Sequence, residues 1–295
     1  MVSGKYSVNK FLAGIDFSSL SYEDKSVLLK KILDNGIHGI SFSPYIDGQE
    51  PGDQICEAQI AQRLSIIEPY TNWIRTFSCV EGNEIAPRVA KQSNLKTMVG
   101  VSLGSDKEKN EIELINGIDL AKNGYVDILA VGNEVLLRGD LSKEELLDYI
   151  KRAKQALPDI DVSYVDAYFQ FEDHPDVVDA CDVILVNCYP FWENCPVEYS
   201  LLYIKEMYRR TVNVAKGKKI IISETGWPST GSVSGATVPS YENAMQYFIN
   251  VYSWAEEEGI EIFYFSSFDE SWKVGDEGDV GAYWGLWDKD GRLKY

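Results

Sequence analysis

The amino-acid sequence predicts a single (β/α)8 TIM barrel, and three observations support this fold class. Short apolar runs alternate with amphipathic segments, which is typical of βαβ units and a parallel sheet. The runs are apolar at successive positions, as expected for strands covered on both faces. Eight or nine such units in 295 residues fit a closed barrel better than an open sheet. Because no Pro-, Gly- or Ser-rich linker interrupts the pattern, we expect one domain over residues 1–295.

Nine segments have the length and composition of strands, which is one more than a barrel of this kind needs. We interpret the first of them and the helix after it as an N-terminal extension, residues 1–35, so that the barrel begins with the second. In chain order the candidates are Phe11–Phe17, Ile37–Phe42, Trp73–Phe77, Thr97–Leu103, Val126–Val131, Asp161–Val165, Val183–Val186, Lys219–Ile222 and Glu261–Phe265.

Helices are predicted between the strands from their end signals. Ser21 is a candidate N-cap for a helix that Gly36 would end. Ser142 is followed three residues later by Glu145, which is the pattern of a capping box, and Pro158 follows the end of the apolar periodicity. The segments IELINGIDLAKNG and YENAMQYFINVYSWAEEEG also have apolar residues at helical spacing.

Composition limits the classes of partner. The chain has 28 Lys and Arg against 46 Asp and Glu, which gives a formal net charge of −18. This negative charge argues against nucleic acid or an anionic membrane as a partner and is compatible with a neutral ligand. No apolar run approaches the roughly 20 residues of a membrane span, so we expect no membrane insertion.

A metal or cofactor is not predicted. The sequence has only two His and no CxxC pair, which argues against a zinc site. The acidic pieces DEGD and DKDG lack the spacing of a calcium-binding EF-hand loop. Cys188 and Cys195 are near enough in sequence to form a disulfide, a pairing that the sequence leaves open. The other three cysteines are Cys56, Cys79 and Cys181.

Two of the predicted strands run into a glutamate at the end where a barrel enzyme carries its chemistry. VDILAV continues into Asn133 and Glu134, and III is followed by Ser223 and Glu224. In a (β/α)8 barrel the carboxyl ends of the strands form the active site. Two carboxylates that face one pocket are the minimum for cleaving a glycosidic bond. Structural readings stay open: a helix N-cap at Asn133 and Glu134, and a strand-to-loop turn with a packed Trp227 after Glu224.

Aromatic and polar residues near other strand ends are candidates for binding a sugar. NCYPFW places Tyr189 and Trp192 at one strand end, and the segment after the last strand contains Trp272 and Trp284 as further flat surfaces. Trp227 offers another such surface in the loop after Glu224. Candidate hydroxyl-binding groups after the last strand are Asp269, Glu270 and Lys273.

Arg75 lies within the apolar segment WIRTFS, inside a predicted strand. A guanidinium in such a position needs a buried carboxylate partner, because an unpaired buried charge is costly. We expect Glu224 to be that partner.

Taken together, these segments resemble glycoside hydrolase family 17, the retaining β-1,3-glucanases and β-1,3-glucanosyltransferases, and most of all its bacterial branch. The resemblance depends on the order and spacing of the motifs, which cover the chain from about Gly39 to the C-terminus. The motifs are GISFSPYIDGQEPGD, IRTFS, VGNEVLLRGDL, VNCYPFW, SETGWPSTG and FDESWK followed by EGDVGAYWGLW. The chain departs from the family pattern at Ser266, where many relatives have Glu, and at Ser271, where they have Pro.

The resemblance implies a (β/α)8 barrel and roles for individual residues. Glu134 is expected to be the acid/base and Glu224 the nucleophile of a double displacement on β-1,3-glucan, with the carboxyl groups about 5–5.5 Å apart. Near the substrate or the nucleophile the family pattern places Tyr45, Arg75, Asn133, Tyr189, Trp227, Trp272 and Lys273.

Three other functions compete with hydrolysis. A glucanosyltransferase would use the same two glutamates and pass the sugar to a hydroxyl group instead of water. A non-catalytic glucan-binding protein would keep the barrel without the reaction. A Schiff-base aldolase would need a desolvated lysine at a strand end, and Lys273 has Asp269 and Glu270 beside it, which favour its charged form.

The expected substrate also predicts a location and an assembly. A polymer such as β-1,3-glucan is met outside the cytoplasm, so we expect a secreted or periplasmic protein whose leader is absent from this chain. We expect it to act as a monomer without a cofactor, since carboxylates fill both catalytic roles.

Overall fold

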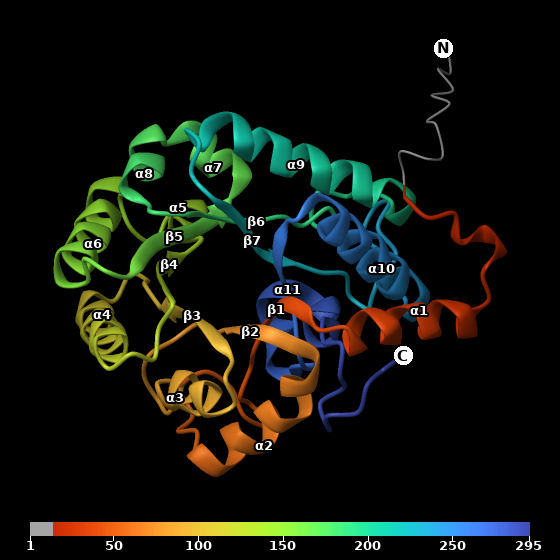
Figure 1. Cartoon of the computed structure of the whole chain (residues 1–295), viewed down its shortest axis with the longest axis horizontal. Coiled ribbons are helices and arrows are strands. Elements are labelled where there is room, and N and C mark those ends of the chain that lie inside the picture. Colours follow the sequence, from red (N-terminus) through yellow and green to blue (C-terminus); the bar gives the residue numbers. More distant parts are fainter. Residues whose placement is uncertain (1–13) are drawn as a thin grey trace.

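A computed structural model of the chain describes residues 14–295. It contains a closed barrel of eight parallel strands, β1 to β8 in chain order (Figure 1). β1 pairs with both β2 and β8, which closes the ring. The predicted fold class is confirmed, and eight of the predicted strands overlap those observed. The strands are β1 Ile37–Ser41, β2 Thr71–Arg75, β3 Lys96–Val101, β4 Ile128–Asn133, β5 Asp161–Ala167, β6 Ile184–Asn187, β7 Ile220–Thr225 and β8 Glu261–Tyr264.

The first predicted strand, Phe11–Phe17, is wrong over the part that the structure describes. Residues 11–13 lie outside the described residues, and the chain from residue 14 to 16 has no regular structure. Phe17–Ser19 then form a short 3₁₀ helix, η2, which is capped by the Asp16 side chain accepting a hydrogen bond from Ser18 N. Because β1 and β8 pair directly, the ring closes without this segment.

Helices surround the barrel and follow the strands in turn (Figure 1). The capping box predicted at Ser142 is present, since Ser142 and Glu145 each accept a hydrogen bond from the backbone N–H of the other. Ser21 caps its helix in the same way with Asp24. The helices are α1 Tyr22–Asp34, α2 Glu57–Ile67, α3 Ile85–Gln92, α4 Lys107–Lys122, α5 Val135–Arg138, α6 Lys143–Ala156, α7 Tyr168–Asp173, α8 Pro175–Ala180, α9 Ser200–Val214, α10 Tyr241–Glu258 and α11 Val274–Glu277.

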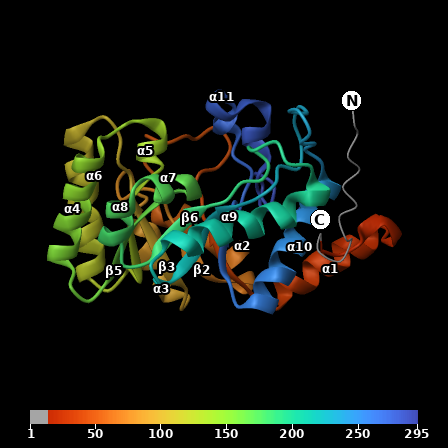
Figure 2. The ribbon, with the colours of Figure 1, turned by 90° about the horizontal axis from the view of Figure 1, so that it is seen from above.

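Helix α1 belongs to the ring of helices, although it precedes the first strand. It lies beside α10 in both ribbon views (Figures 1 and 2). After β8 the chain forms only short turns, η5 Ser271–Lys273, α11 and η6 Gly278–Tyr283, so the last strand has no long helix of its own to cover it. The predicted extension, residues 1–35, therefore contains a helix that completes the cover of the barrel.

This position of α1 predicts that its buried face stabilises the whole domain. Leu29 is 0% exposed and Val27, on the same helix, is 65% exposed. Replacing Leu29 by Ala is expected to lower the free energy of unfolding by about 2–5 kcal/mol, because it leaves a cavity in a packed core. Val27→Ala is the control and is expected to stay within about 0.5 kcal/mol of wild type. Equal effects of both variants in urea unfolding would show that α1 is peripheral.

Two buried clusters fill the barrel wall and its interior. The larger cluster lies between the strands and the surrounding helices. The smaller one comes mainly from inward positions of the strands and includes Met98, Ile128, Val165, Leu185 and Phe263. The buried charged side chains Arg75 and Glu224 lie at or next to the carboxyl ends of β2 and β7, as expected of a (β/α)8 barrel.

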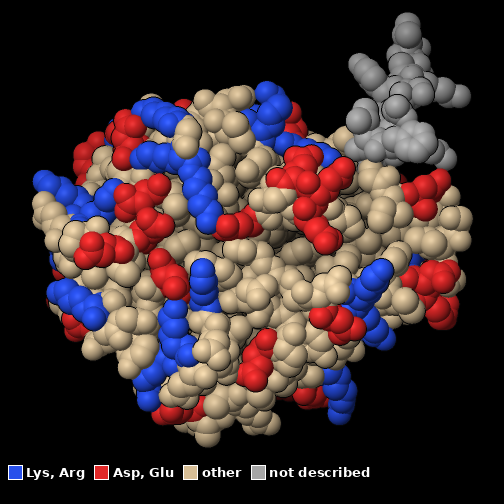
Figure 3. All heavy atoms as spheres, in the orientation of Figure 1, with Lys and Arg blue, Asp and Glu red and all other residues tan. Residues whose placement is uncertain are grey.

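Three further observations concern the charged surface, the cysteines and the apolar character of the helices. Acidic and basic side chains are interspersed over the face shown in Figure 3, and no broad basic patch is visible there. The five cysteines are free thiols, so Cys188 and Cys195 are not bridged. Among the helices of residues 14–295, none combines the length and the apolar character needed to cross a membrane.

Candidate active site

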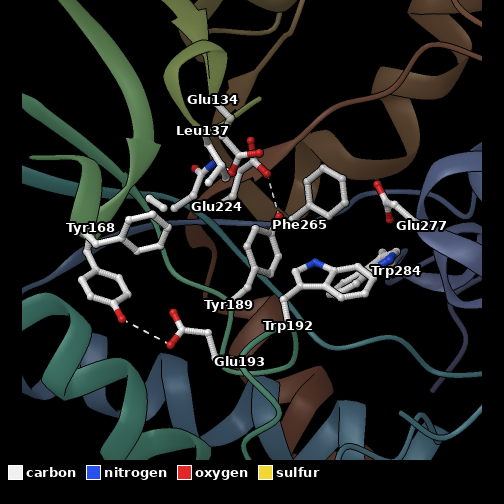
Figure 4. A pocket seen from close by; sticks show the side chains of 13 residues that line it. Glu134, Leu137, Tyr168, Tyr189, Trp192, Glu193, Glu224, Phe265, Glu277 and Trp284 are labelled. Atoms are coloured by element: carbon white, nitrogen blue, oxygen red, sulfur yellow. Dashed lines mark hydrogen bonds between the residues drawn. The ribbon is translucent and has the colours of Figure 1, made fainter. Parts of the chain in front are cut away.

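A pocket of about 310 Å³ contains both of the predicted catalytic glutamates. Glu134 follows β4 directly and Glu224 lies in β7, near its carboxyl end. Figure 4 shows their carboxyl groups side by side in the pocket. Asn187, Glu193 and Glu277 are further polar residues in its lining. Its aromatic lining consists of Tyr168, Phe169, Tyr189, Trp192, Phe265 and Trp284.

The backbone at the end of β4 directs Glu134 into this pocket. The register between β4 and β5 shifts between Ala130 and Asn133, and Gly132 has a φ of 87°. Glu134 itself has a φ of 53°, in the left-handed region that residues with a Cβ rarely adopt. Its N–H still bonds Val165 O at 2.8 Å. Such a conformation costs roughly 1–3 kcal/mol and is typical of functional sites.

The alternative reading of Glu134 as a helix cap is wrong. Glu134 occupies the N-cap position of α5, but its side chain makes no capping hydrogen bond. Instead, Asn187 Nδ2 donates to Glu134 Oε1 at 2.8 Å. Asn187 also donates to Asn133 Oδ1 at 3.3 Å, and Ser223 Oγ donates to Asn187 Oδ1 at 2.9 Å. One asparagine at the end of β6 thus fixes the positions of both residues of the Asn133–Glu134 pair.

Glu224 is held by donors on both carboxylate oxygens. Arg75 forms an ion pair with Oε1, as predicted, and Tyr189 donates its hydroxyl to Oε2 at 2.6 Å. The guanidinium also donates to Ser223 O and to Asn133 Oδ1, each at 2.9 Å. Burial raises the pKa of Tyr189 well above its ordinary value, so its hydroxyl remains a donor at neutral pH. These contacts stabilise the negative charge of Glu224 and fix its direction.

Glu134 has the opposite environment. Burial is the largest influence and raises its pKa to about 7, with the negative charges of Glu224 and then Asp166 acting in the same direction. The hydrogen bond from Asn187 and the charge of Arg75 oppose this shift. A substantial fraction of Glu134 therefore carries a proton near neutral pH, which a general acid requires.

Asp166 and Tyr164 form a buried pair behind the turn that carries Glu134. Both side chains are 0% exposed, and the Tyr164 hydroxyl donates to Asp166. The same hydroxyl accepts a hydrogen bond from Leu136 N at 3.0 Å, and Ala167 N donates to Asp166 Oδ1 at 2.8 Å. Burial raises the pKa of Asp166 to about 6, so at pH 7 its carboxylate is mainly ionised beside Glu134.

Removing the charge of Asp166 should lower the pKa of Glu134. In Asp166→Asn the repulsion that favours protonated Glu134 is lost, so the alkaline limb of kcat/KM should move to lower pH. The measurement is a pH profile on β-1,3-glucan. Asp159→Asn is the control, because this exposed aspartate precedes the other end of β5. An unchanged alkaline limb in a folded Asp166→Asn enzyme would show that the charge of Asp166 does not raise the pKa of Glu134.

Two of the predicted substrate-binding residues have structural roles instead. Trp227 is 1% exposed and donates its Nε1–H to Val238 O at 3.1 Å, while its ring packs on Phe191 and Tyr247. It is a core residue, as the packed-Trp reading had it. Asp269 pairs with Lys294 at 2.9 Å and accepts from Gly285 N, which ties the end of the chain to the barrel.

Four other predicted residues form a cluster outside the pocket lining. Glu270 pairs with Lys273 at 2.8 Å and accepts a hydrogen bond from Trp272 Nε1 at 3.1 Å. Trp272 packs edge-on against Tyr45, with ring centres 6.1 Å apart. The Lys273 ammonium lies 4.0 Å from the centre of the Phe265 ring, whose side chain lines the pocket. Lys273 forms an ion pair with Glu270, which argues against the hypothesis of a Schiff-base aldolase.

Sequence reasoning missed several residues of the pocket. Asn187 had a usable signal, since it ends an apolar run as Asn133 does. Tyr168 and Phe169 begin α7 immediately after β5, where the sequence shows no contrast between strand and helix. Glu277 lies on a four-residue helix without periodicity. Within residues 14–295, no group of three or more potential metal ligands is present.

Several known fungal proteins have similar sequences. A probable family 17 glucosidase of Saccharomyces cerevisiae is 28% identical over 268 residues, which cover 87% of this chain and 66% of that protein. A glucan 1,3-beta-glucosidase of Candida albicans is 28% identical over 258 residues, covering 79% of this chain and 83% of the relative.

Solved structures agree with the sequence comparison. The family 17 β-1,3-glucanosyltransferase of Rhizomucor miehei superposes with a TM-score of 0.79 at 28% identity, covering 88% of this chain and 96% of that one. An endo-laminarinase from Formosa has a TM-score of 0.78 at 18% identity and shows the shared fold. The BtgE/BtgC glycoside hydrolase domain matches residues 39–285, so the chain belongs to this group of glycoside hydrolase family 17.

Proposed function

We propose that this protein cleaves β-1,3-glucan with retention of configuration at the anomeric carbon. One observation supports this most strongly: two glutamates share a pocket but have opposed environments. Glu224 accepts hydrogen bonds from Arg75 and Tyr189, whereas burial holds the pKa of Glu134 near 7. A carboxylate that hydrogen bonds hold in one orientation, and an acid whose raised pKa lets it donate a proton near neutral pH, are the two groups that the reaction needs.

The first step forms a covalent intermediate. Glu224 attacks the anomeric carbon of the glucosyl residue above it, and Glu134 gives its proton to the oxygen of the leaving sugar. The bond between the anomeric carbon and that oxygen breaks as the bond to Glu224 forms. The ion pair with Arg75 and the hydrogen bond from Tyr189 keep the attacking carboxylate in one orientation.

In the second step Glu134 acts as a general base instead of a general acid. Glu134 is now a carboxylate and removes a proton from a water molecule, whose oxygen attacks the anomeric carbon and releases Glu224. Asn187 orients Glu134 in both steps, because its Nδ2 donates to a carboxylate oxygen that is present in either protonation state.

The names of the relatives support this substrate class. The Candida albicans relative is a glucan 1,3-beta-glucosidase. A Rhizomucor miehei β-1,3-glucanosyltransferase was crystallised as an active-site mutant with laminaritriose, and it shares 28% identity and a TM-score of 0.79 with this chain. A laminarin-like β-1,3-glucan is therefore the substrate to test first.

Transfer to a sugar acceptor is the second candidate function, and exposed aromatic surface at the pocket favours it. Trp192 is 48% exposed and lines the pocket, and Phe169 lines it as a half-buried residue. An aromatic face that binds a second sugar lets a hydroxyl group, instead of water, attack the intermediate.

A product time course on linear and branched β-1,3-glucans separates these functions. Shorter sugars alone indicate hydrolysis, and products longer than the starting oligosaccharide indicate transfer. The anomeric configuration of the first product, read by proton NMR, tests retention. Binding of the glucan without any new product would contradict both reactions and indicate a glucan-binding protein.

The remaining expectations are part of the proposal. We place the protein outside the cytoplasm, secreted or periplasmic, because its polymeric substrate is found there, and we expect it to act as a monomer. Membership of a bacterial branch of the family stays a prediction based on the sequence motifs. Cell fractionation and size-exclusion chromatography of the purified protein test the first two points.

A further inference from the structure

Besides Glu134 and Glu224, two carboxyl groups line the pocket without a role in the two-step reaction. Glu193 accepts hydrogen bonds from the hydroxyls of Tyr168 and Tyr203, and Glu277 is the other. Glu277 ends α11, the short helix that lies on the same side of the barrel as α5 (Figure 2). Its side chain forms no ion pair with any other residue that the structure describes, because the nearby Lys273 is paired with Glu270 at 2.8 Å. A carboxyl group placed in this way can accept a hydrogen bond from a ligand, or donate one when it is protonated.

Trp284 supplies a donor to the same part of the pocket. Its side chain is 2% exposed and lines the pocket, and its Nε1–H has no hydrogen-bond acceptor of normal geometry among the described residues, although Glu277 lies nearby. A buried N–H whose contact with the nearest acceptor falls short of normal hydrogen-bond geometry can still donate to a ligand. A ligand hydroxyl that accepts from Trp284 and donates to Glu277 would satisfy both groups.

Trp192 adds an apolar surface beside these two polar groups. Its ring lies 5.5 Å from the ring of Trp284, measured between ring centres, and its side chain is half exposed. Figure 4 shows Trp192, Trp284 and Glu277 on one side of the catalytic pair, with Tyr168 on the other. Stacking on an aromatic face together with hydrogen bonds to hydroxyl groups is the combination that a pyranose ring requires.

The protonation of Glu277 suits contacts with sugar hydroxyl groups. Burial, and then the negative charges of Glu224 and Glu270, raise its pKa to about 7, against the opposing charge of Lys273. Near neutral pH the carboxyl group can therefore accept a hydrogen bond or donate one. Because these side chains lie beside the catalytic pair (Figure 4), a glucosyl residue bound to them adjoins the bond that is cleaved.

We infer that Glu277, Trp284 and Trp192 form a subsite beside the catalytic pair that binds the hydroxyl groups and one face of a β-glucosyl residue. This inference rests on the proposed function, because it assumes a glucan in the pocket. It assigns Glu277 to substrate binding and not to proton transfer.

Binding is measured first in an enzyme that cannot turn over. Glu134→Gln keeps the oxygen that Asn187 contacts and removes the acid. Calorimetric titration of this variant with laminaritriose and laminarihexaose gives reference affinities. Adding Glu277→Ala, and separately Glu277→Gln, should weaken binding of the longer sugar, by about tenfold for Ala, because a hydrogen bond to a sugar hydroxyl is lost in a buried site. Adding Glu257→Ala, at an exposed position of α10, should leave both affinities unchanged.

The outcomes separate this inference from the proposed function. If Glu134→Gln binds the sugars and the Glu277 variants bind them equally well, the subsite is refuted while the function stands. If Glu134→Gln binds neither sugar, the proposed substrate itself is wrong. In the active enzyme, Glu277→Ala should raise KM for the glucan and change kcat by only a few-fold. A large loss of kcat with unchanged KM would overturn the binding role.

Discussion

Replacing Glu224 by Ala is expected to reduce turnover of β-1,3-glucan by about 10⁴-fold or more, since removal of a catalytic nucleophile has effects of this order. The carboxylate lies in the pocket with Glu134 and is 6% exposed. No other group in the described structure accepts hydrogen bonds from both Arg75 and Tyr189, so no neighbour can replace it. Rates of sugar release from laminarin measure the effect.

Chemical rescue of Glu224→Ala by a small anion is a second test of the nucleophile. The space left by Glu224→Ala admits a small anion such as azide, which can attack the same face of the anomeric carbon when Glu134 supplies the proton. A glucosyl azide of inverted configuration is then expected, because one displacement replaces two. Glu257→Ala, at an exposed position, is the matched control and should keep full activity. Wild-type turnover in a folded Glu224→Ala protein would refute the nucleophile assignment.

Replacing Arg75 by Met is expected to lower the free energy of unfolding by about 3–5 kcal/mol and to remove most of the activity. Arg75 is 1% exposed and contacts Glu224, Asn133 and the carbonyl oxygen of Ser223. Without the guanidinium, Glu224 is a buried charge whose remaining donor is Tyr189. The hydrogen bond that orients Asn133 is lost as well, so the effect reaches the neighbour of the acid. Urea unfolding and laminarin turnover measure the two losses.

Three further variants show whether the charge of Arg75 or the planar shape of its guanidinium causes these losses. Arg75→Lys keeps the charge but cannot contact Glu224 and Asn133 with one planar group, so intermediate losses are expected. Arg75→Met combined with Glu224→Gln should destabilise less than the sum of the two single changes, because neither partner is then left charged alone. Arg209→Met removes an arginine whose side chain is 61% exposed and should change stability by less than about 0.5 kcal/mol. Strict additivity in the double variant would show that the ion pair carries no coupling.

The two glutamates could be predicted because polar residues at the end of an apolar run contradict the local pattern. A carboxylate next to a core strand has few structural explanations, and barrel topology brings such strand ends together. The ion pair of Arg75 with Glu224 could be predicted in a similar way, because a charged side chain within a buried strand requires a partner of opposite charge. The sequence does not show in the same way whether the side chain of a loop residue points into the pocket or into the core. Trp227 comes three residues after Glu224, yet it turns away from the pocket and packs on Tyr247.

The remaining parts of the site depend on distant contacts that the sequence does not encode locally. Glu277 reaches the pocket because η6 and α11 fold back over the strand ends, and four residues are too few for a helical pattern. The left-handed conformation of Glu134 could not be predicted from the sequence either, because glutamate is not a residue type that favours positive φ. The place of α1 in the ring follows from its packing on α10, which lies at the other end of the chain.

The packing of α1 on α10 has a practical consequence for dissecting this protein. The family match begins at residue 39, within β1 and after α1. A fragment trimmed to that boundary would lose two residues of the first strand and would uncover apolar surface on α10. Exposed surface of this kind promotes aggregation. Homology-guided truncation is thus expected to yield an insoluble polypeptide, whereas starting before Ser21 keeps the helix together with its cap.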